Sequence, residues 1–161
     1  MNHSQSHTEI GNYTKFVIML FVSFCAMYIT MYFNSYSIDH VYFSLTRLYM
    51  SGMGIACMAL IMWFFMKKMY PNKRKNRAII TCSIVLFVSA LFLVRAQKPL
   101  VQDVLWMKAM IPHHSIAILT SERADLQDPE VKKLAEKISN AQRQEIEEMK
   151  MMIERLEQSS K

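Results

Sequence analysis

Three long runs without any charged residue or histidine constrain this chain most. They cover residues 16–33, 48–66 and 78–94, which are 18, 19 and 17 residues long. An α-helix rises about 1.5 Å per residue, so each run comes close to the roughly 30 Å thickness of a bilayer core. The sequence therefore predicts a membrane region over residues 16–98, with one transmembrane helix in each run, preceded by a polar tail over residues 1–15.

The formal net charge of +6 is unevenly distributed. Residues 1–98 contain ten Lys or Arg and two acidic residues, a net charge of +8. Residues 99–161 contain nine Lys or Arg and eleven acidic residues, a net charge of −2. The basic excess therefore belongs to the membrane region. The remainder has no basic stripe interleaved with aromatic residues, so nucleic acid is not an expected partner.

The loops between the runs predict the topology. Six of the eleven residues in the loop 67–77 are basic and none is acidic, a bias that keeps short loops in the cytoplasm. The loop 34–46 has no Lys or Arg and can be exported. We therefore expect a multi-pass protein of a bacterial inner (cell) membrane, with its N-terminus in the cytoplasm. The segment 99–161 would then be periplasmic or extracellular.

Aromatic and sulfur-containing side chains add weaker signals. Aromatic residues near the outer ends are expected to form an interfacial belt: Tyr32, Phe33, Tyr36, Tyr42 and Phe43. One cysteine lies in each run: Cys25, Cys57 and Cys82. Methionines recur at helical spacing: Met58, Met62 and Met66, and Met27 with Met31. Packing and lipid contact are the commonest roles of such side chains, although the methionine sulfurs would also suit a copper path.

Residues 99–161 have the pattern of a soluble helical hairpin. Pro99 ends the third apolar run, because proline disfavours helix at the residue before it. One helix is expected from about Asp103 to Ala124, and a second from about Pro129 to Leu156. Asp128 can cap the second helix, whose first position suits a proline.

Both helices carry apolar stripes that polar residues interrupt. The first stripe is Asp103, Met107, Met110, His114, Ala117 and Ser121, flanked by Ile111 and Ile118. The second is Val131, Ala135, Ile138, Gln142, Glu145, Met149, Met152 and Leu156. Antiparallel pairing of the two helices would place the polar residues that interrupt the two stripes at the same level of the hairpin. A two-helix hairpin cannot bury such stripes alone, so we expect a homodimer or higher homo-oligomer forming a four-helix bundle. Packing against the membrane region is the alternative.

The side chains at that level suit a soft metal ion. Thioether sulfur favours Cu(I) and, by the same softness, Ag(I), whereas imidazole suits copper, zinc, iron or nickel. Met110 and His114 share one helix face, and Met107 lies one turn earlier. Met149 and Met152 offer sulfurs from the other helix. The spacing also fits a metal-free polar core, in which the histidine is hydrogen-bonded to an acidic residue.

The run Met110-Ile111-Pro112-His113-His114-Ser115-Ile116-Ala117 resembles the signature of the bacterial family known as domain of unknown function 305. The second half of the family pattern is also present: Asp128-Pro129-Glu130-Val131, Leu134-Ala135, Ile138, Ala141-Gln142, Glu145-Ile146 and Met149. The resemblance implies a ferritin-like fold, export or membrane anchoring and, from the CopM-like members, copper binding. The chain departs from the pattern at Ser115, where Gln is usual, and it has one hairpin where many members have two.

We therefore expect an extracytoplasmic, membrane-anchored Cu(I)- or Ag(I)-binding protein that acts in metal buffering, delivery or resistance. The expected ligands, with the resemblance implying the first four, are Met110, His113, His114, Met149 and Met107. The residues expected to surround them are Asp103, Gln142, Glu145 and Met152. The alternative is a metal-free helical module that mediates oligomerisation of a membrane protein. A ferritin-like redox enzyme is disfavoured, because no Glu-x-x-His pair occurs. No set of catalytic residues can be placed, so an enzyme is not expected.

Overall fold

The computed structural model describes residues 3–98 and 100–159. In chain order the helices are α1 (His3–Thr30), η1 (Ile38–His40), α2 (Leu45–Met66), η2 (Lys67–Met69), α3 (Lys73–Ala96), α4 (Asp103–Arg123) and α5 (Pro129–Ser159). No β-strand occurs in the part of the chain that the structure describes, so the predicted all-α fold class is confirmed. The helices belong to two compact units. One comprises residues 1–29 and 46–97, and the other comprises residues 30–45 and 98–161.

The first unit contains three helices that are long and apolar enough to cross a membrane: Gly11–Thr30, Leu45–Met69 and Lys73–Ala96. The three predicted spans are therefore present, but their bounds differ. The first helix begins at His3, within the segment expected to be a tail, and ends three residues earlier than predicted. The third begins at Lys73, where the Asn72 side chain accepts hydrogen bonds from the Arg74 and Lys75 amides. Such side-chain capping fixes the start of a helix.

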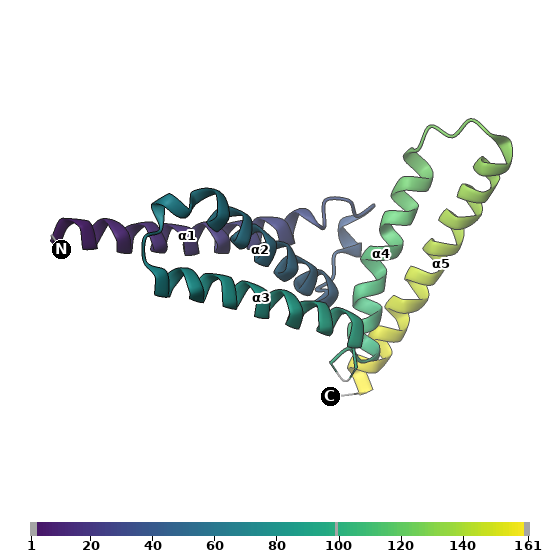
Figure 1. Ribbon diagram of the computed structural model, residues 1–161. Helices are drawn as coiled ribbons and strands as arrows, with labels where there is room; N and C mark the ends of the chain where they lie inside the picture. The colour runs from purple at the N-terminus through teal and green to yellow at the C-terminus, as the bar shows by residue number, and fades with distance from the viewer. Residues whose placement is uncertain (1–2, 99, 160–161) are drawn as a thin grey trace. The chain divides into compact units, whose positions relative to one another are not determined.

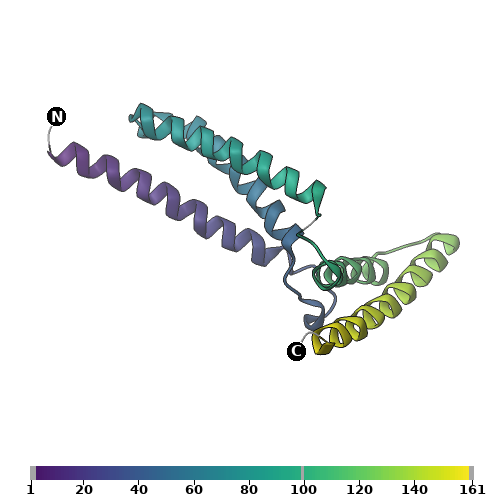
Figure 2. The ribbon, with the colours of Figure 1, turned by 90° about the horizontal axis from the view of Figure 1, so that it is seen from below.

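An aromatic cluster holds the first unit together at the end that carries the basic loop. Tyr70 and Phe16 are each only 1% exposed, with ring centroids 5.4 Å apart, and Tyr13 stacks against Tyr70 at 5.1 Å. The Tyr13 hydroxyl also donates to Asn76 Oδ1 over 2.8 Å. In Figure 2, α1 lies on one side and α2 lies beside α3 on the other. Small residues meet at this second pairing, where a Cβ built on Gly52 would lie 3.9 Å from the Ala90 Cβ, an ordinary van der Waals distance.

The second unit contains the hairpin of α4 and α5, which run antiparallel (Figure 1). Their bounds agree with the predicted helices to within a few residues. The predicted cap is confirmed, because Asp128 Oδ1 accepts from the amides of Glu130 and Val131 at 2.8 and 3.0 Å. Pro99, expected to end the third run, lies outside the described residues. That helix ends at Ala96, after which Gln97 has a positive φ of 50°.

The buried face of the hairpin is rotated from the predicted stripes. Its core consists of Met107, Ile111, Ile118, Ile146, Met149 and Ile153. Ile111 and Ile118 thus occupy the centre of the α4 face rather than its flanks. Met107 and Met149 lie in the core as predicted. The predicted stripes are wrong at the positions that are exposed: Asp103, Val131, Ile138, Glu145 and Met152. On α5 the buried positions include Ser139, Ile146 and Ile153, which recur every seven residues. Ile146 and Ile153 pack in one cluster with Ile111 and Ile118 of α4.

The segment 30–45 packs onto the hairpin, which the sequence did not predict. The Tyr36 amide donates to the Ser115 hydroxyl over 2.7 Å, and the same oxygen lies 3.0 Å from Nδ1 of His40. Ser115 is fully buried and His40 is 7% exposed. Tyr36 and Tyr42 pack against the hairpin core, so these two rings are not simply part of an interfacial belt. We call residues 36–42 the latch segment.

Charged groups reinforce the latch segment. Lys150 Nζ lies 2.6 Å from Asp39 Oδ2, and the Arg143 guanidinium lies 4.6 Å from the centre of the Tyr36 ring. Hydrogen bonds from Lys150 and Ser37 lower the pKa of Asp39 to about 2. Burial lowers the pKa of His40, although the Asp39 carboxylate opposes that shift. The latch segment is therefore held by a neutral histidine and an ionised aspartate.

Ser115→Ala is expected to loosen the latch segment. The substitution leaves the Tyr36 amide without its acceptor inside the structure, and an unsatisfied buried donor costs about 1–3 kcal/mol. Hydrogen exchange should report faster opening of residues 36–42, while the α4 and α5 amides stay protected. Ser121→Ala, the same change two turns along α4, is the control. Unchanged exchange in Ser115→Ala would contradict the role given to this hydroxyl.

The attachment of the latch segment should also weaken in mild acid. Because the folded-state pKa of His40 is lowered, the unfolded segment binds more protons below its usual value of 6.5, and stability falls as pH drops through that value. Of the charged groups facing the ring, Asp39 and Glu147 oppose this trend, whereas Lys150 and Arg143 favour it. Protection factors of residues 36–42, corrected for intrinsic exchange, should fall from pH 7.5 to pH 5.5. His40→Gln should remove that pH dependence, and His113→Gln should not.

Candidate functional site

His114 is held at both ring nitrogens. Nδ1 lies 2.9 Å from the carbonyl oxygen of Met110, one turn earlier on α4, and Nε2 lies 2.7 Å from Oε2 of Glu145 on α5. A carbonyl oxygen can only accept, so Nδ1 carries a proton and donates it. Nε2 is therefore the nitrogen that faces α5. Metal-binding histidines commonly have this arrangement, in which one ring nitrogen donates to a carbonyl and leaves the other for the metal.

The Glu145 side chain connects His114 to a second polar group. It is half exposed, whereas the His114 side chain is 14% exposed. Gln142, one turn earlier on α5, donates from Nε2 to Glu145 Oε2 over 3.5 Å, a long hydrogen bond. The structure therefore brings together His114, Gln142 and Glu145, which were predicted to lie at the same level of the hairpin. This arrangement also fits the metal-free alternative, because each nitrogen of the imidazole already lies beside a hydrogen-bond acceptor.

Three of the predicted methionine ligands lie in or against the hairpin core. Met107 is 4% exposed and Met149 is 7% exposed, and both belong to the buried cluster. Met110 is partly buried and packs against that cluster. Because Met110 lies one turn before His114, its thioether and the His114 ring share a face of α4. Thioether sulfurs thus lie on both helices of the hairpin, in or against its core.

The remaining predicted residues lie at the surface. His113 is exposed, with its ring centre 6.0 Å from that of His114 and its face turned away from the core. Met152 is 37% exposed. Asp103 is exposed in the first turn of α4, where a negative charge favours the helix dipole. Within one chain, Asp103 is therefore a helix-start residue, and His113 faces solvent.

The side chains available as ligands determine which metal ions the hairpin could bind. Within residues 11–98 and 100–159, no group of three or more His, Cys, Asp or Glu side chains could hold a metal ion. Structural zinc sites use such residues almost alone, and di-iron sites need several glutamates. Thioether sulfur is the further donor type that the hairpin offers to a site built around His114. Imidazole with thioethers fits Cu(I) or Ag(I) better than zinc or iron.

Sequence reasoning missed the residues that attach the latch segment, above all Ser115, His40 and Lys150. One signal was available, because Ser115 is the position at which the chain departs from the family pattern. A glutamine there would be larger than the enclosed site that Ser115 fills. The Asp39-His40 pair in an otherwise uncharged loop was a second signal, but its partners on α4 and α5 could be identified only from the fold.

Comparison with known proteins agrees with this architecture. Residues 96–161 match the domain of unknown function DUF305. The chain is also 30% identical over 146 residues to the uncharacterized protein L153 of Acanthamoeba polyphaga mimivirus, a match that covers 89% of this chain and 93% of that protein. The likeness to the viral protein therefore extends through the membrane-type helices as well as the hairpin. No solved structure matches the chain.

The His114–Glu145 pair should be dispensable for folding. Glu145 is half exposed, and exposed ion pairs contribute about 0–1 kcal/mol. Glu145→Ala is therefore expected to lower the free energy of unfolding by less than about 1 kcal/mol. Ile146→Ala, one residue along, should cost about 2–5 kcal/mol, because Ile146 is 1% exposed in the core. Chemical denaturation monitored by circular dichroism compares the two. A larger loss for Glu145→Ala would make the pair a structural element.

Proposed function

Since this chain belongs to the DUF305 family, we propose that it is a membrane-anchored protein that binds Cu(I), and by the same chemistry Ag(I), outside the cytoplasm. The hairpin of α4 and α5 would capture the ion, and the apolar helices would keep the hairpin at the membrane surface. Buffering and handing on of the metal are the roles that suit such a protein. The proposal involves no catalytic step.

The observation that carries the proposal is the fixed orientation of His114. The Met110 carbonyl oxygen lies 2.9 Å from Nδ1, so Nε2 is directed toward α5, at the level of Gln142 and Glu145. A soft cation would take the place of the Nε2 proton. The Glu145 carboxylate would then stay beside a positive charge, and the ring would not need to turn. Such prior orientation reduces the free-energy cost of binding.

The methionines supply the other donors in this proposal. Met110 on α4 and Met149 on α5 would be the sulfur donors, and Met107 would extend the set by one turn of α4; all three lie in or against the hairpin core. A thioether is uncharged, so a site made from it can be buried without the desolvation cost of a carboxylate. His113, exposed next to His114, would be the first donor that an arriving ion meets.

The composition of the second unit supports a location outside the cytoplasm. The segment 30–45 and the hairpin belong to one compact unit, so both must lie on the same side of the membrane. That segment contains no Lys or Arg, whereas the loop 67–77 is strongly basic and follows the other end of α2. The positive-inside rule then assigns the basic loop to the cytoplasm and the hairpin to the opposite side.

A competition titration tests copper binding. Full-length protein in lipid nanodiscs would be titrated anaerobically with Cu(I) against a chromogenic chelator. Cys25, Cys57 and Cys82 would be replaced by alanine, because free thiols bind Cu(I) themselves. One tight ion per hairpin, or one per pair of hairpins, is the expected result. The double variant Met110→Leu with Met149→Leu should weaken binding at least about tenfold, as loss of metal-site residues typically does.

The matched control is Met151→Leu, because Met151 is 64% exposed on α5 and lies outside the core cluster. Leucine and methionine have similar volumes, so each swap should cost less than about 1.5 kcal/mol of stability. Circular dichroism would confirm that the variants keep their helices. If the double variant binds Cu(I) as tightly as the control, the site assigned to the hairpin is wrong.

A second candidate function, oligomerisation through the hairpin, is favoured by one specific observation. On the face of α5 that the latch segment does not cover, apolar side chains are exposed to 37–56%: Val131, Leu134, Ile138 and Met152. They lie on the same helix face as Glu145, and heptad spacing is typical of helix pairing. A second hairpin packed there would complete a four-helix bundle, and the two functions can coexist.

Leu134→Glu is expected to separate the copies, because it places a charge in the centre of this apolar face. Mass photometry of the full-length protein in detergent or nanodiscs would measure the change in mass. Met151→Glu adds the same charge on another face of α5 and should leave the oligomer intact. A wild-type protein that is monomeric at all concentrations would contradict the oligomerisation function and leave the copper proposal untouched.

A further inference from the structure

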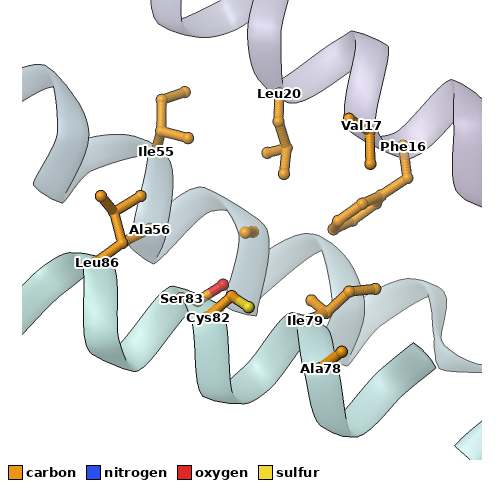
Figure 3. Close-up of a pocket in the computed structure, with 11 residues that line it drawn as sticks. Phe16, Val17, Leu20, Ile55, Ala56, Ala78, Ile79, Cys82, Ser83 and Leu86 are labelled. Carbon is orange, nitrogen blue, oxygen red and sulfur yellow. The ribbon is translucent and has the colours of Figure 1, made fainter. Parts of the chain in front are cut away.

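An apolar groove of about 300 Å³ runs between α1 on one side and α2 and α3 on the other (Figure 3). Phe16 and Leu20 of α1 face it from one wall, and Ile55, Ile79 and Cys82 face it from the other. Its lining is almost wholly apolar, with the Ser83 hydroxyl as the polar exception. The groove lies within the helices that are long and apolar enough to cross a membrane. At that depth water is absent, so an apolar ligand has to fill it.

Small side chains make the groove. Ala56, Ala59 and Ala78 belong to its lining, where larger residues would fill the space. Close contact between α2 and α3 uses such small residues, as Gly52 against Ala90 illustrates. The α1 wall, however, is lined by larger side chains, and Val17 remains 63% exposed. α1 therefore does not close the groove, which stays open to one side.

One end of the groove carries positive charge. Lys75 lies on the same face of α3 as Ala78, Ile79 and Cys82, at i, i+3, i+4 and i+7. Its ammonium lies 4.8 Å from the centre of the Tyr13 ring, and Tyr13 belongs to the same buried cluster as the groove residue Phe16. Five more cationic residues lie nearby in the sequence, in η2 and in the first turns of α3: Lys67, Lys68, Lys73, Arg74 and Arg77. An anion at this end would meet strong attraction.

We propose that the groove binds an acyl chain of an anionic phospholipid whose phosphate is held by Lys75. The ligand comes from the leaflet that faces the loop 67–77. A second copy of the chain fits this end less well, because no Asp or Glu occurs between Asp39 and Asp103, so its α2 and α3 bring no anion to Lys75. A phospholipid supplies both the apolar chain and the negative charge. This inference does not depend on metal binding.

Native mass spectrometry of the full-length protein tests the proposal. Protein released from detergent micelles would be titrated with phosphatidylglycerol or with phosphatidylcholine. One phosphatidylglycerol molecule per chain should remain bound, and phosphatidylcholine should bind several-fold more weakly. Lys75→Gln should weaken phosphatidylglycerol binding about fivefold, the factor that one lysine contributes near an anionic lipid surface, and Lys75→Arg should restore it. Lys73→Gln removes the same charge from another face of α3 and should have a smaller effect.

A groove-filling variant provides the independent check. Ala78→Phe should reduce binding of both lipids, because its ring occupies the groove, whereas Ile84→Phe on another face of α3 should not. Equal retention of the two lipids with no effect of Lys75→Gln would overturn the anionic head-group site. Unchanged lipid binding by Ala78→Phe would overturn the groove as the chain site. A lipid-free mass of two chains would identify a second copy as the occupant instead.

Discussion

The packing of Ile111 and Ile118 of α4 against Ile146 of α5 is the contact on which the hairpin depends. All three side chains are at most 1% exposed. Burying one such side chain contributes about 1.5–3 kcal/mol, and two helices can bury these residues together only in one antiparallel register. That register sets His114 opposite Glu145 and places Met107 and Met149 in one cluster. The geometry of the candidate site therefore follows from an apolar contact that includes none of its polar residues.

Helix bounds and turns could be predicted from local chemistry. Asp128 and Pro129 are strong start signals for α5, and the start of that helix was predicted correctly. Uninterrupted apolar runs locate the spans but not all of their bounds, because α1 begins at His3, well before the predicted run. The buried face of α5 was harder. Two apolar faces compete on this helix, one through Val131 and Ile138 and the other through Ile146 and Ile153. Spacing alone cannot separate them, because the partner side chains on α4 decide which face is buried.

The latch segment was beyond prediction for a different reason. Its contacts join residues that are more than 70 positions apart, such as Tyr36 and Ser115, and no local pattern encodes such pairs. The segment contacts Arg143 and Lys150 on one face of the hairpin and leaves the face that carries Glu145 exposed. The Ser115 hydroxyl and the ion pair between Asp39 and Lys150 thus mark the face that the latch segment contacts. His114 and Ser115 are neighbours in sequence, yet they lie on different faces of α4, because successive residues of a helix are about 100° apart. His114 contacts Glu145 of α5, and Ser115 contacts the latch segment.

The central claim of this account is that the hairpin provides mixed sulfur and nitrogen ligands for Cu(I). X-ray absorption spectroscopy of the Cu(I)-loaded, cysteine-free protein tests that claim most directly, because thioether sulfur and imidazole nitrogen scatter differently. The account predicts both kinds of scatterer, with the nitrogen lost in His114→Ala and the sulfur lost when Met110 and Met149 become leucine. A first shell of nitrogen and oxygen alone, unchanged by these substitutions, would contradict it.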